Sequence, residues 1–247
     1  MTLQDFFRGN PKCALGFSGG VDSAYLLYEG LRCGADVKPY YIKTAFQPAF
    51  EHADALRLAK KLGVEVTVLE LDVLSEPAIT SNPADRCYHC KRRLFQTLKD
   101  RAISDGYPIL LDGTNASDQA EDRPGMRAIR ELSVRSPLRE CGLTKAEIRA
   151  CSKQAGLFTW NKPAYACLAT RIPTGEPITG EVLHRVEEAE EALFRLGFTD
   201  FRVRVFHGAA RLQLPGDQME RAVREASAIR GALTPYFSPI LLDLEER

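Results

Sequence analysis

The sequence predicts an α/β protein in which a doubly wound parallel sheet of the Rossmann type precedes a small C-terminal α+β domain. Three observations support this prediction. Apolar strand-like runs alternate with amphipathic helical segments through the first half of the chain. A glycine-rich turn joins the first such strand to the first such helix, and the pattern changes after a Pro- and Gly-containing stretch at 173–177.

The first half supplies the expected parallel sheet. Apolar runs predict strands at 12–17, 37–43, 64–71 and 109–112. Helical periodicity is present at 22–33, 50–62 and 88–103. Thr144 and Glu147 have the spacing of a capping box, which predicts another helix that begins there. Strands that alternate with helices favour a parallel sheet, because a parallel connection must cross from one end of the sheet to the other.

The stretch at 173–177 is interpreted as a linker between a first domain at 1–177 and a second at 178–247. The apolar stripe of the next predicted helix consists of Val182, Val186, Ala189 and Leu193. The following strand alternates apolar residues at 201, 203 and 205 with Arg202 and Arg204, so one of its faces presents two guanidinium groups. A hairpin partner at 210–215, a helix at 217–230 and a strand at 239–244 complete the second domain.

Charge and hydropathy disfavour several classes of protein. Lys+Arg and Asp+Glu are equal at 33 each in 247 residues, so the basic excess that nucleic acid binding requires is missing. No apolar run approaches the length of about 18 residues that a membrane helix needs. Residues 1–12 lack the apolar core of a signal peptide. We therefore expect a cytoplasmic protein with no membrane partner and no favoured nucleic acid partner.

The cysteines indicate metal or redox chemistry. There are seven, an odd number, and two of them form Cys87-Tyr88-His89-Cys90. A reducing cytosol disfavours structural disulfides, so this pair is better explained as metal ligands or as a redox dithiol. A zinc site with a fourth ligand such as His89 is one alternative. The redox alternative is weaker, because the βαβ start typical of such motifs is occupied here by a different loop.

That loop is Ser18-Gly19-Gly20-Val21-Asp22-Ser23, which follows the strand Ala14-Leu15-Gly16-Phe17 and opens a helix. Two glycines allow a close approach of the backbone to an anion, and the N–H groups and dipole of a helix N-terminus favour negative charge. Ser18 and Ser23 add hydroxyl donors, and Asp22 is a candidate ligand for Mg²⁺. A plain glycine turn without a nucleotide is the alternative.

These six residues resemble the signature of the PP-loop ATP pyrophosphatases, whose fold is a HUP-like variety of the Rossmann type. The resemblance implies that the loop holds the β and γ phosphates of ATP. AMP would then pass to an acceptor oxygen while pyrophosphate leaves, with Mg²⁺ stabilising the leaving group. Members of this superfamily differ in the nucleophile that follows, which is ammonia in some and sulfur in others.

A further set of motifs is Asp112-Gly113-Thr114-Asn115-Ala116-Ser117-Asp118 to Arg123, the stretch from Trp160 to Pro173 that contains Cys167, and Arg202-Val203-Arg204. With the phosphate loop, in this order and over nearly the whole chain, it resembles the LarE family of ATP-dependent sulfur transferases. The resemblance implies a mononucleotide acceptor, a pyridinium dicarboxylate whose carboxylate is adenylated and converted to a thiocarboxylate. That product belongs to the nickel-pincer cofactor of lactate racemase.

The resemblance also implies roles for single residues. Cys167 matches the cysteine of the sulfur site, which is sacrificial in one branch of the family. In another branch it joins two further cysteines around a [4Fe–4S] cluster whose extra sulfide is the donor, so sulfide or another sulfur donor is an expected partner. The pair Cys87 and Cys90 places this chain with the second branch, because three thiolates leave one iron of a cubane open.

The remaining matches concern phosphate groups. Arg171, Arg202 and Arg204 would bind the acceptor phosphate, with Glu190 as an acidic site residue, although Arg202 and Arg204 also suit a solvated strand face. Asp118 and Arg123 match a second nucleotide-side loop and also suit an ordinary polar loop. A homo-oligomer, as in the hexamers of the family, is expected by resemblance. The rival hypotheses are a PP-loop tRNA thiolase and a nucleotide-binding module with structural zinc and no turnover.

Overall fold

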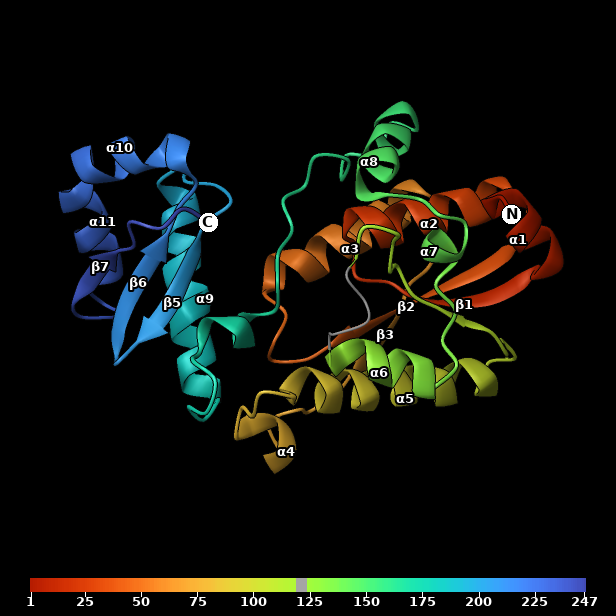
Figure 1. Cartoon of the computed structure of the whole chain (residues 1–247), viewed down its shortest axis with the longest axis horizontal. Coiled ribbons are helices and arrows are strands. Elements are labelled where there is room, and N and C mark those ends of the chain that lie inside the picture. Colours follow the sequence, from red (N-terminus) through yellow and green to blue (C-terminus); the bar gives the residue numbers. More distant parts are fainter. Residues whose placement is uncertain (119–123) are drawn as a thin grey trace. The chain divides into compact units, whose positions relative to one another are not determined.

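A computed structural model describes residues 1–118 and 124–247 of the chain (Figure 1). By their contacts these residues divide into two compact units, and each unit is discontinuous in sequence. The first unit consists of Met1–Thr44, Ala49–Asp72 and Asp85–Lys162, and the second of Ala45–Pro48, Val73–Ala84 and Pro163–Arg247. Residues 163–177 thus cluster with the second unit, whereas a domain boundary after residue 177 stays a prediction.

The first unit contains a parallel sheet of four strands in the order β3-β2-β1-β4. Its strands are β1 (Lys12–Gly16), β2 (Asp36–Lys43), β3 (Thr67–Glu70) and β4 (Leu110–Leu111). The predicted α/β class and all four predicted strands are confirmed, although β3 and β4 are shorter than the apolar runs suggested. The sheet order places β1 in the interior, so the turn at its carboxyl end lies where ligands bind in open α/β sheets.

Helices cover both faces of this sheet, as Figure 1 shows. They are α1 (Leu3–Gly9), α2 (Val21–Arg32), α3 (Ala49–Lys61), α5 (Arg86–Ser104), α6 (Pro124–Glu131), α7 (Pro137–Glu140) and α8 (Lys145–Gln154). Successive residues of β1 pack into hydrophobic cores on opposite faces of the sheet, because side chains alternate along a strand. Cys13 and Leu15 pack with residues of α1, α2 and α3, whereas Ala14 packs with residues of α5 and α6.

The second unit contains a mixed sheet of three strands in the order β5-β6-β7. Its elements are α4 (Pro77–Thr80), the 3₁₀ helix η1 (Leu168–Arg171), α9 (Gly180–Arg195), β5 (Arg202–Phe206), β6 (Ala209–Gln213), α10 (Gly216–Arg224), α11 (Ala226–Leu233) and β7 (Ile240–Leu242). The pairs β5–β6 and β6–β7 are antiparallel and parallel, respectively. The single helix predicted at 217–230 is wrong, because the chain leaves helical geometry at Glu225, between α10 and α11.

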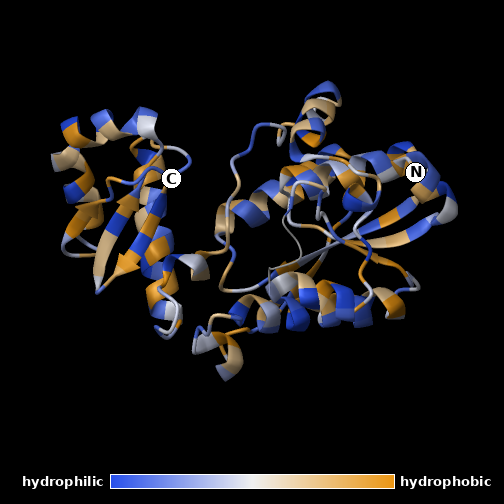
Figure 2. Cartoon of the chain, in the orientation of Figure 1, coloured by the Kyte–Doolittle hydropathy of each residue, from blue (hydrophilic) through white to orange (hydrophobic). Residues whose placement is uncertain are grey.

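Hydrophobic and hydrophilic residues alternate around the helices of both units, as expected for amphipathic helices (Figure 2). Within the part of the chain that the structure describes, no helix is both long and apolar enough to cross a membrane.

Candidate active site

The phosphate loop connects the end of β1 to α2, which begins at Val21. Gly19 has a φ of 73°, and a Cβ at this position would lie 2.8 Å from the Cα of Ala55 in α3. A residue with a side chain would therefore meet both backbone strain and a collision. Gly20 is the N-cap of α2 and has no side chain to cap it, so the N–H groups of the first turn are open to an anionic ligand.

Hydroxyl groups line the same turn. The Oγ atoms of Ser18 and Ser23 lie 3.2 Å apart, and Ser18 Oγ also accepts from the backbone N–H of Gly20 at 3.4 Å. Ser23 is buried, and its hydroxyl donates to the carbonyl of Gly20 at 3.3 Å. The two side chains therefore make hydrogen bonds within the loop, with Ser23 buried and Ser18 exposed.

Asp22 is held from two directions by Asn115 and Lys145, to which the sequence reasoning assigned no role. Asn115 Nδ2 donates to Asp22 Oδ1 at 3.2 Å, and the ammonium of Lys145 lies 2.5 Å from Asp22 Oδ2. The Asp22 and Lys145 side chains are 21% and 35% exposed, so the ion pair is accessible to a ligand. The capping box at Thr144 and Glu147 was the available signal, because it fixes Lys145 as the first residue of α8.

The loop after β4 is built to approach the phosphate loop closely. Asp112 is buried and accepts from the hydroxyls of Thr114 and Ser136 at 2.5 and 2.6 Å. A Cβ on Gly113 would lie 3.1 Å from the backbone N of Ser23, which is tighter than most side chains tolerate. Glycine here lets the two loops meet.

This second loop is also tied to the start of α8. Ala116 N donates to Leu143 O at 2.8 Å, and Lys145 N donates to Ser117 Oγ at 2.9 Å. Asp118 Oδ2 accepts from the backbone N–H of Asn115 at 3.0 Å, so it shapes the loop that carries Asn115. Arg123, the other residue expected here, lies outside the described residues.

Cys87 and Cys90 lie in the first turn of α5, and their spacing puts both thiols on one side of the helix. Cys87 is exposed and Cys90 half-buried, and none of the seven cysteines, all of which are described, forms a disulfide. The pair belongs to the first unit and Cys167 to the second. Within residues 1–118 and 124–247 the structure forms no cluster of three or more His, Cys, Asp or Glu side chains that could hold a metal ion.

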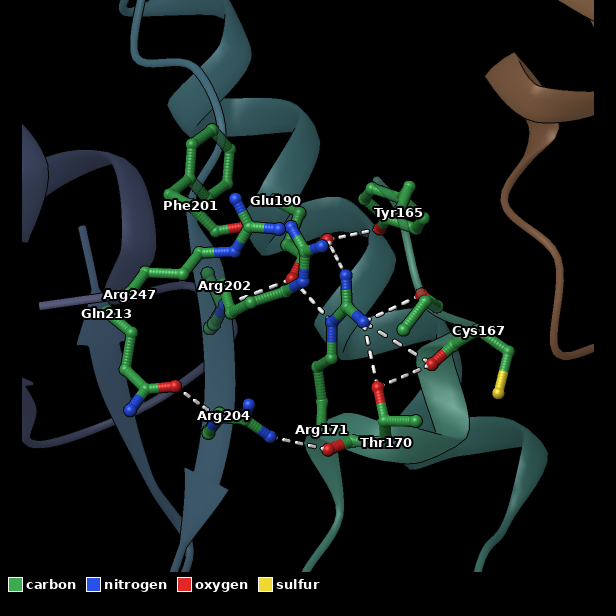
Figure 3. A network of polar contacts seen from close by, with 12 residues as sticks. Tyr165, Cys167, Thr170, Arg171, Glu190, Phe201, Arg202, Arg204, Gln213 and Arg247 are labelled. Atoms are coloured by element: carbon green, nitrogen blue, oxygen red, sulfur yellow. Dashed lines mark hydrogen bonds and ion pairs between the residues drawn. The ribbon is translucent and has the colours of Figure 1, made fainter. Parts of the chain in front are cut away.

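Cys167 precedes η1 in a segment of the second unit held by arginines (Figure 3). Arg171 forms an ion pair with Glu190 of α9, with Nε 2.9 Å from Oε1 and side-chain exposures of 0% and 2%. The same guanidinium donates to the carbonyls of Ala166 and Cys167 at 2.7 and 3.3 Å. In this structure Arg171 therefore faces the backbone of the Cys167 segment, and its contact with an acceptor phosphate stays a prediction.

Tyr165 completes the surroundings of Glu190. Its hydroxyl donates to Glu190 Oε2, and the guanidinium groups of Arg171 and Arg202 lie 4.5 and 4.9 Å from the centroid of its ring. Burial, followed by the charge of Glu190, raises the pKa of Tyr165, so the hydroxyl stays protonated.

Arg202 and Arg204 also contact this segment. Arg202 donates to Ala164 O at 2.5 Å and Arg204 to Thr170 O at 2.7 Å. Arg202 is 6% exposed, so the alternative of a solvated strand face is wrong for this residue. Burial, with the neighbouring charge of Arg171, lowers the pKa of Arg202 to about 10, and the same causes lower the pKa of Arg204. Positive charge is thus concentrated beyond what Glu190 compensates, which favours an anionic ligand.

Arg247 is a member of this network that the sequence reasoning missed. It forms an ion pair with Asp200 and donates to Ala164 O at 2.9 Å. Burial, and then the charge of Arg171, lowers the pKa of Arg247. No local motif marks this residue, because its role depends on the fold of the whole second unit.

A parallel sheet whose first strand turns through this glycine and serine loop into a helix defines a nucleotide-binding enzyme of the PP-loop class. Comparison with known proteins agrees, although no protein-family model matches the chain. The chain is 29% identical to a tRNA-specific 2-thiouridylase of Thermotoga sp. over 61% of its own length and 54% of that enzyme. It is 37% identical to an uncharacterized protein of Synechocystis sp., over 99% of this chain and 92% of the relative.

A third relative specifies the family. The chain is 34% identical to the pyridinium-3,5-bisthiocarboxylic acid mononucleotide synthase of Lactiplantibacillus plantarum, over 87% of this chain and 78% of that enzyme. The chain therefore belongs to the LarE family, the family of this synthase.

Proposed function

We propose that the chain is an ATP-dependent sulfur transferase that adenylates a carboxylate of a pyridinium dicarboxylate mononucleotide and converts it to a thiocarboxylate. The product would serve synthesis of the nickel-pincer cofactor of lactate racemase. The observation that carries the proposal is the phosphate loop with Asp22, Asn115 and Lys145 gathered at its helix N-terminus, in a chain 34% identical to the named synthase.

The phosphate loop would bind the β and γ phosphates of ATP through the N–H groups at the start of α2 and the hydroxyls of Ser18 and Ser23. The carboxylate oxygens of Asp22 fit Mg²⁺, which prefers oxygen ligands, with Asp118 and Arg123 as further candidates at the same nucleotide. Lys145 adds a positive charge beside the phosphates. An acceptor carboxylate oxygen would attack the α phosphorus, and the loop would retain pyrophosphate as the leaving group.

The acceptor phosphate would bind Arg202 and Arg204, with Arg171 and Glu190 in the same network. One buried and one half-buried guanidinium group, both with lowered pKa values, and one compensating carboxylate are a favourable place for a phosphate dianion. Guanidinium groups suit this task because their fork of N–H donors matches two phosphate oxygens.

Cys87 and Cys90 suit part of an iron–sulfur site, because thiolates are its usual ligands and these two lie one helical turn apart. Cys167 would be the third ligand. When bound, a [4Fe–4S] cluster would offer one iron without a protein ligand, at which sulfide can bind. Zinc at Cys87 and Cys90 is the alternative metal. A homo-oligomer in the cytoplasm remains part of the proposal.

The test is anaerobic purification of wild type, Cys87→Ala and the control Cys33→Ala, which changes a half-buried cysteine at the end of α2. We expect iron and sulfide in wild type and control, and loss of most iron and of nearly all sulfur transfer in Cys87→Ala. Adenylation should survive, because the phosphate loop does not use Cys87.

Other outcomes separate the alternatives. One sulfur transferred per chain, with Cys167 lighter by the mass of H₂S, would show a sacrificial cysteine in place of a cluster. Zinc without iron would support the structural metal. Failure of the wild type to release pyrophosphate with ATP and a mononucleotide dicarboxylate would overturn the enzyme proposal itself.

A further inference from the structure

The backbone around Cys167 is fixed on both of its sides. The carbonyl of Ala166, in the peptide before Cys167, accepts from Arg171 at 2.7 Å. The carbonyl of Cys167, in the peptide after it, accepts from Arg171 at 3.3 Å and from the hydroxyl of Thr170 at 2.8 Å. The N–H of that second peptide, on Leu168, donates to the carbonyl of Phe46 at 2.9 Å.

We propose that Arg171, held by Glu190, is a positioning residue that fixes the backbone of Cys167, and with it the direction of the Cα–Cβ bond that carries the thiol, for sulfur transfer. The proposal rests on the proposed role of Cys167 as the sulfur-site cysteine. It gives Arg171 a task at the sulfur segment, separate from binding the acceptor phosphate.

The geometry explains why one guanidinium can do this. The direction of a Cα–Cβ bond is set by the two peptide planes that flank it, since each plane is rigid. Arg171 contacts the carbonyl of both planes around Cys167, whose φ and ψ are −55° and 149°. Figure 3 shows the guanidinium between these carbonyls and Glu190, with the thiol of Cys167 pointing away from the network.

Glu190 fixes the guanidinium in turn. Its carboxylate accepts from Arg171 Nε and Nη2 at 2.9 and 3.1 Å. It also accepts from the backbone N–H of Val203 in β5 at 3.0 Å. Glu190 and Arg171 therefore link α9 and β5 to the backbone of Cys167 through a chain of hydrogen bonds. A lysine ammonium is a compact charge without this planar fork and cannot reproduce the same set of contacts.

Thiol reactivity tests the proposal without depending on the natural substrate. The full ligand-free chain is treated with iodoacetamide, and alkylation of Cys167 is followed by peptide mass spectrometry, with the exposed Cys87 of the same molecules as the internal reference. Arg171→Lys should change the ratio of the Cys167 and Cys87 rates by about tenfold, because the thiol loses its fixed direction. The sulfur-transfer kcat should fall about a hundredfold with the KM for ATP unchanged, since displacements near 1 Å cost that much.

The control is Arg185→Lys. Arg185 lies in α9 of the same unit and also donates to a backbone carbonyl, at 2.9 Å. That carbonyl belongs to Tyr236, which is far from Cys167 in sequence. It should leave the rate ratio unchanged. A change of equal size in the control would show general loosening of the unit and would overturn the positioning role.

Arg171 is the buried ion-pair partner of Glu190, so a substitution of Arg171 can prevent folding. A milder variant is therefore included. Thr170→Val removes the hydroxyl that accepts from Arg171 at 2.9 Å and donates to Cys167 O. It should shift the ratio of alkylation rates about threefold, in the same direction as a folded Arg171→Lys. Unchanged reactivity of Cys167 in every folded variant overturns the positioning role. If the reactivity changes as expected but the wild type transfers no sulfur, only the proposed function is refuted.

Discussion

The ammonium of Lys145 and the carboxylate of Asp22 form an ion pair at 2.5 Å across 123 positions of sequence. The pair joins the first residue of α8 to the first turn of α2. It exists because the loop after β4 is bonded to the start of α8 and is packed through Gly113 against the phosphate loop. Lys145 is therefore placed where the negative charge of a bound polyphosphate would lie.

Lys145→Met should lower the kcat for pyrophosphate release about a hundredfold, because one preorganised charge at a transferring phosphoryl group contributes on this order. The stability of the fold should change little, since the pair is partly exposed. Pyrophosphate release and thermal unfolding are measured together. Lys153→Met, an exposed lysine on the same helix, is the control, and equal activity of the two variants would remove Lys145 from the active site.

Gly19→Ala should destabilise the first unit more than Gly34→Ala. Both glycines have a positive φ, 73° and 78°, so each alanine costs about 1–2 kcal/mol in backbone strain. Only at Gly19 does the new Cβ collide with α3, which adds roughly 1–3 kcal/mol. Chemical unfolding compares the free energies of unfolding. Equal losses would mean that the loop and α3 do not pack as described.

Arg204→Gln should raise the KM for the mononucleotide acceptor about tenfold or more while the KM for ATP stays the same, because it would remove the charged hydrogen bond that we propose to the acceptor phosphate. The matched control is Arg211→Gln on the neighbouring strand β6, paired with Arg204 in register. A parallel rise in the KM for ATP would place Arg204 at the nucleotide instead.

Acid stability should depend on Asp105. Hydrogen bonds from Lys38 and then Tyr40, both at 2.9 Å, lower the pKa of its carboxyl to about 2 from 3.8. A carboxyl whose pKa is depressed in the folded state stabilises the fold above the unfolded pKa, and this stabilisation is lost as the pH falls through the folded pKa. The free energy of unfolding of the wild type should therefore decrease between about pH 4 and pH 2. Asp105→Asn lacks this contribution of the carboxylate at every pH, so its free energy of unfolding should not show that decrease.

Urea unfolding at several pH values tests this expectation. Asp100→Asn, at an exposed position of α5, the helix whose C-cap is Asp105, is the control and should follow the wild type. A difference between wild type and Asp105→Asn that stays constant down to pH 2 would contradict the assignment.

The sequence alone predicted those features that depend on local pattern. Apolar runs located all four strands of the parallel sheet, and the glycine and serine motif located the turn into α2. Features that depend on distant segments were missed. The capping box beside Lys145 locates the start of α8, but no local pattern at Lys145 or Asn115 indicates Asp22 as a partner, since the contact requires the sheet to bring β1 and β4 together.

The same limit applies to the second unit. Alternation along β5 correctly separated its two faces but could not reveal that Arg202 is buried against Tyr165 and Ala164. Likewise the periodicity at 217–230 continues through Glu225, where the backbone breaks the helix. Burial of a charged residue and a break without proline or glycine are both decided by tertiary packing.

The discontinuity of the second unit has a consequence for synthesis on the ribosome. Once residue 162 has been made, every segment of the first unit exists, whereas the second unit still lacks its largest segment, 163–247. The carbonyls of Phe46 and Thr80 accept hydrogen bonds from the N–H groups of Leu168 and Ile178, which are synthesised later. Segments 45–48 and 73–84 are therefore synthesised long before the rest of the second unit to which they belong. Because that unit is discontinuous in sequence, no single cut in the chain releases it as one intact piece.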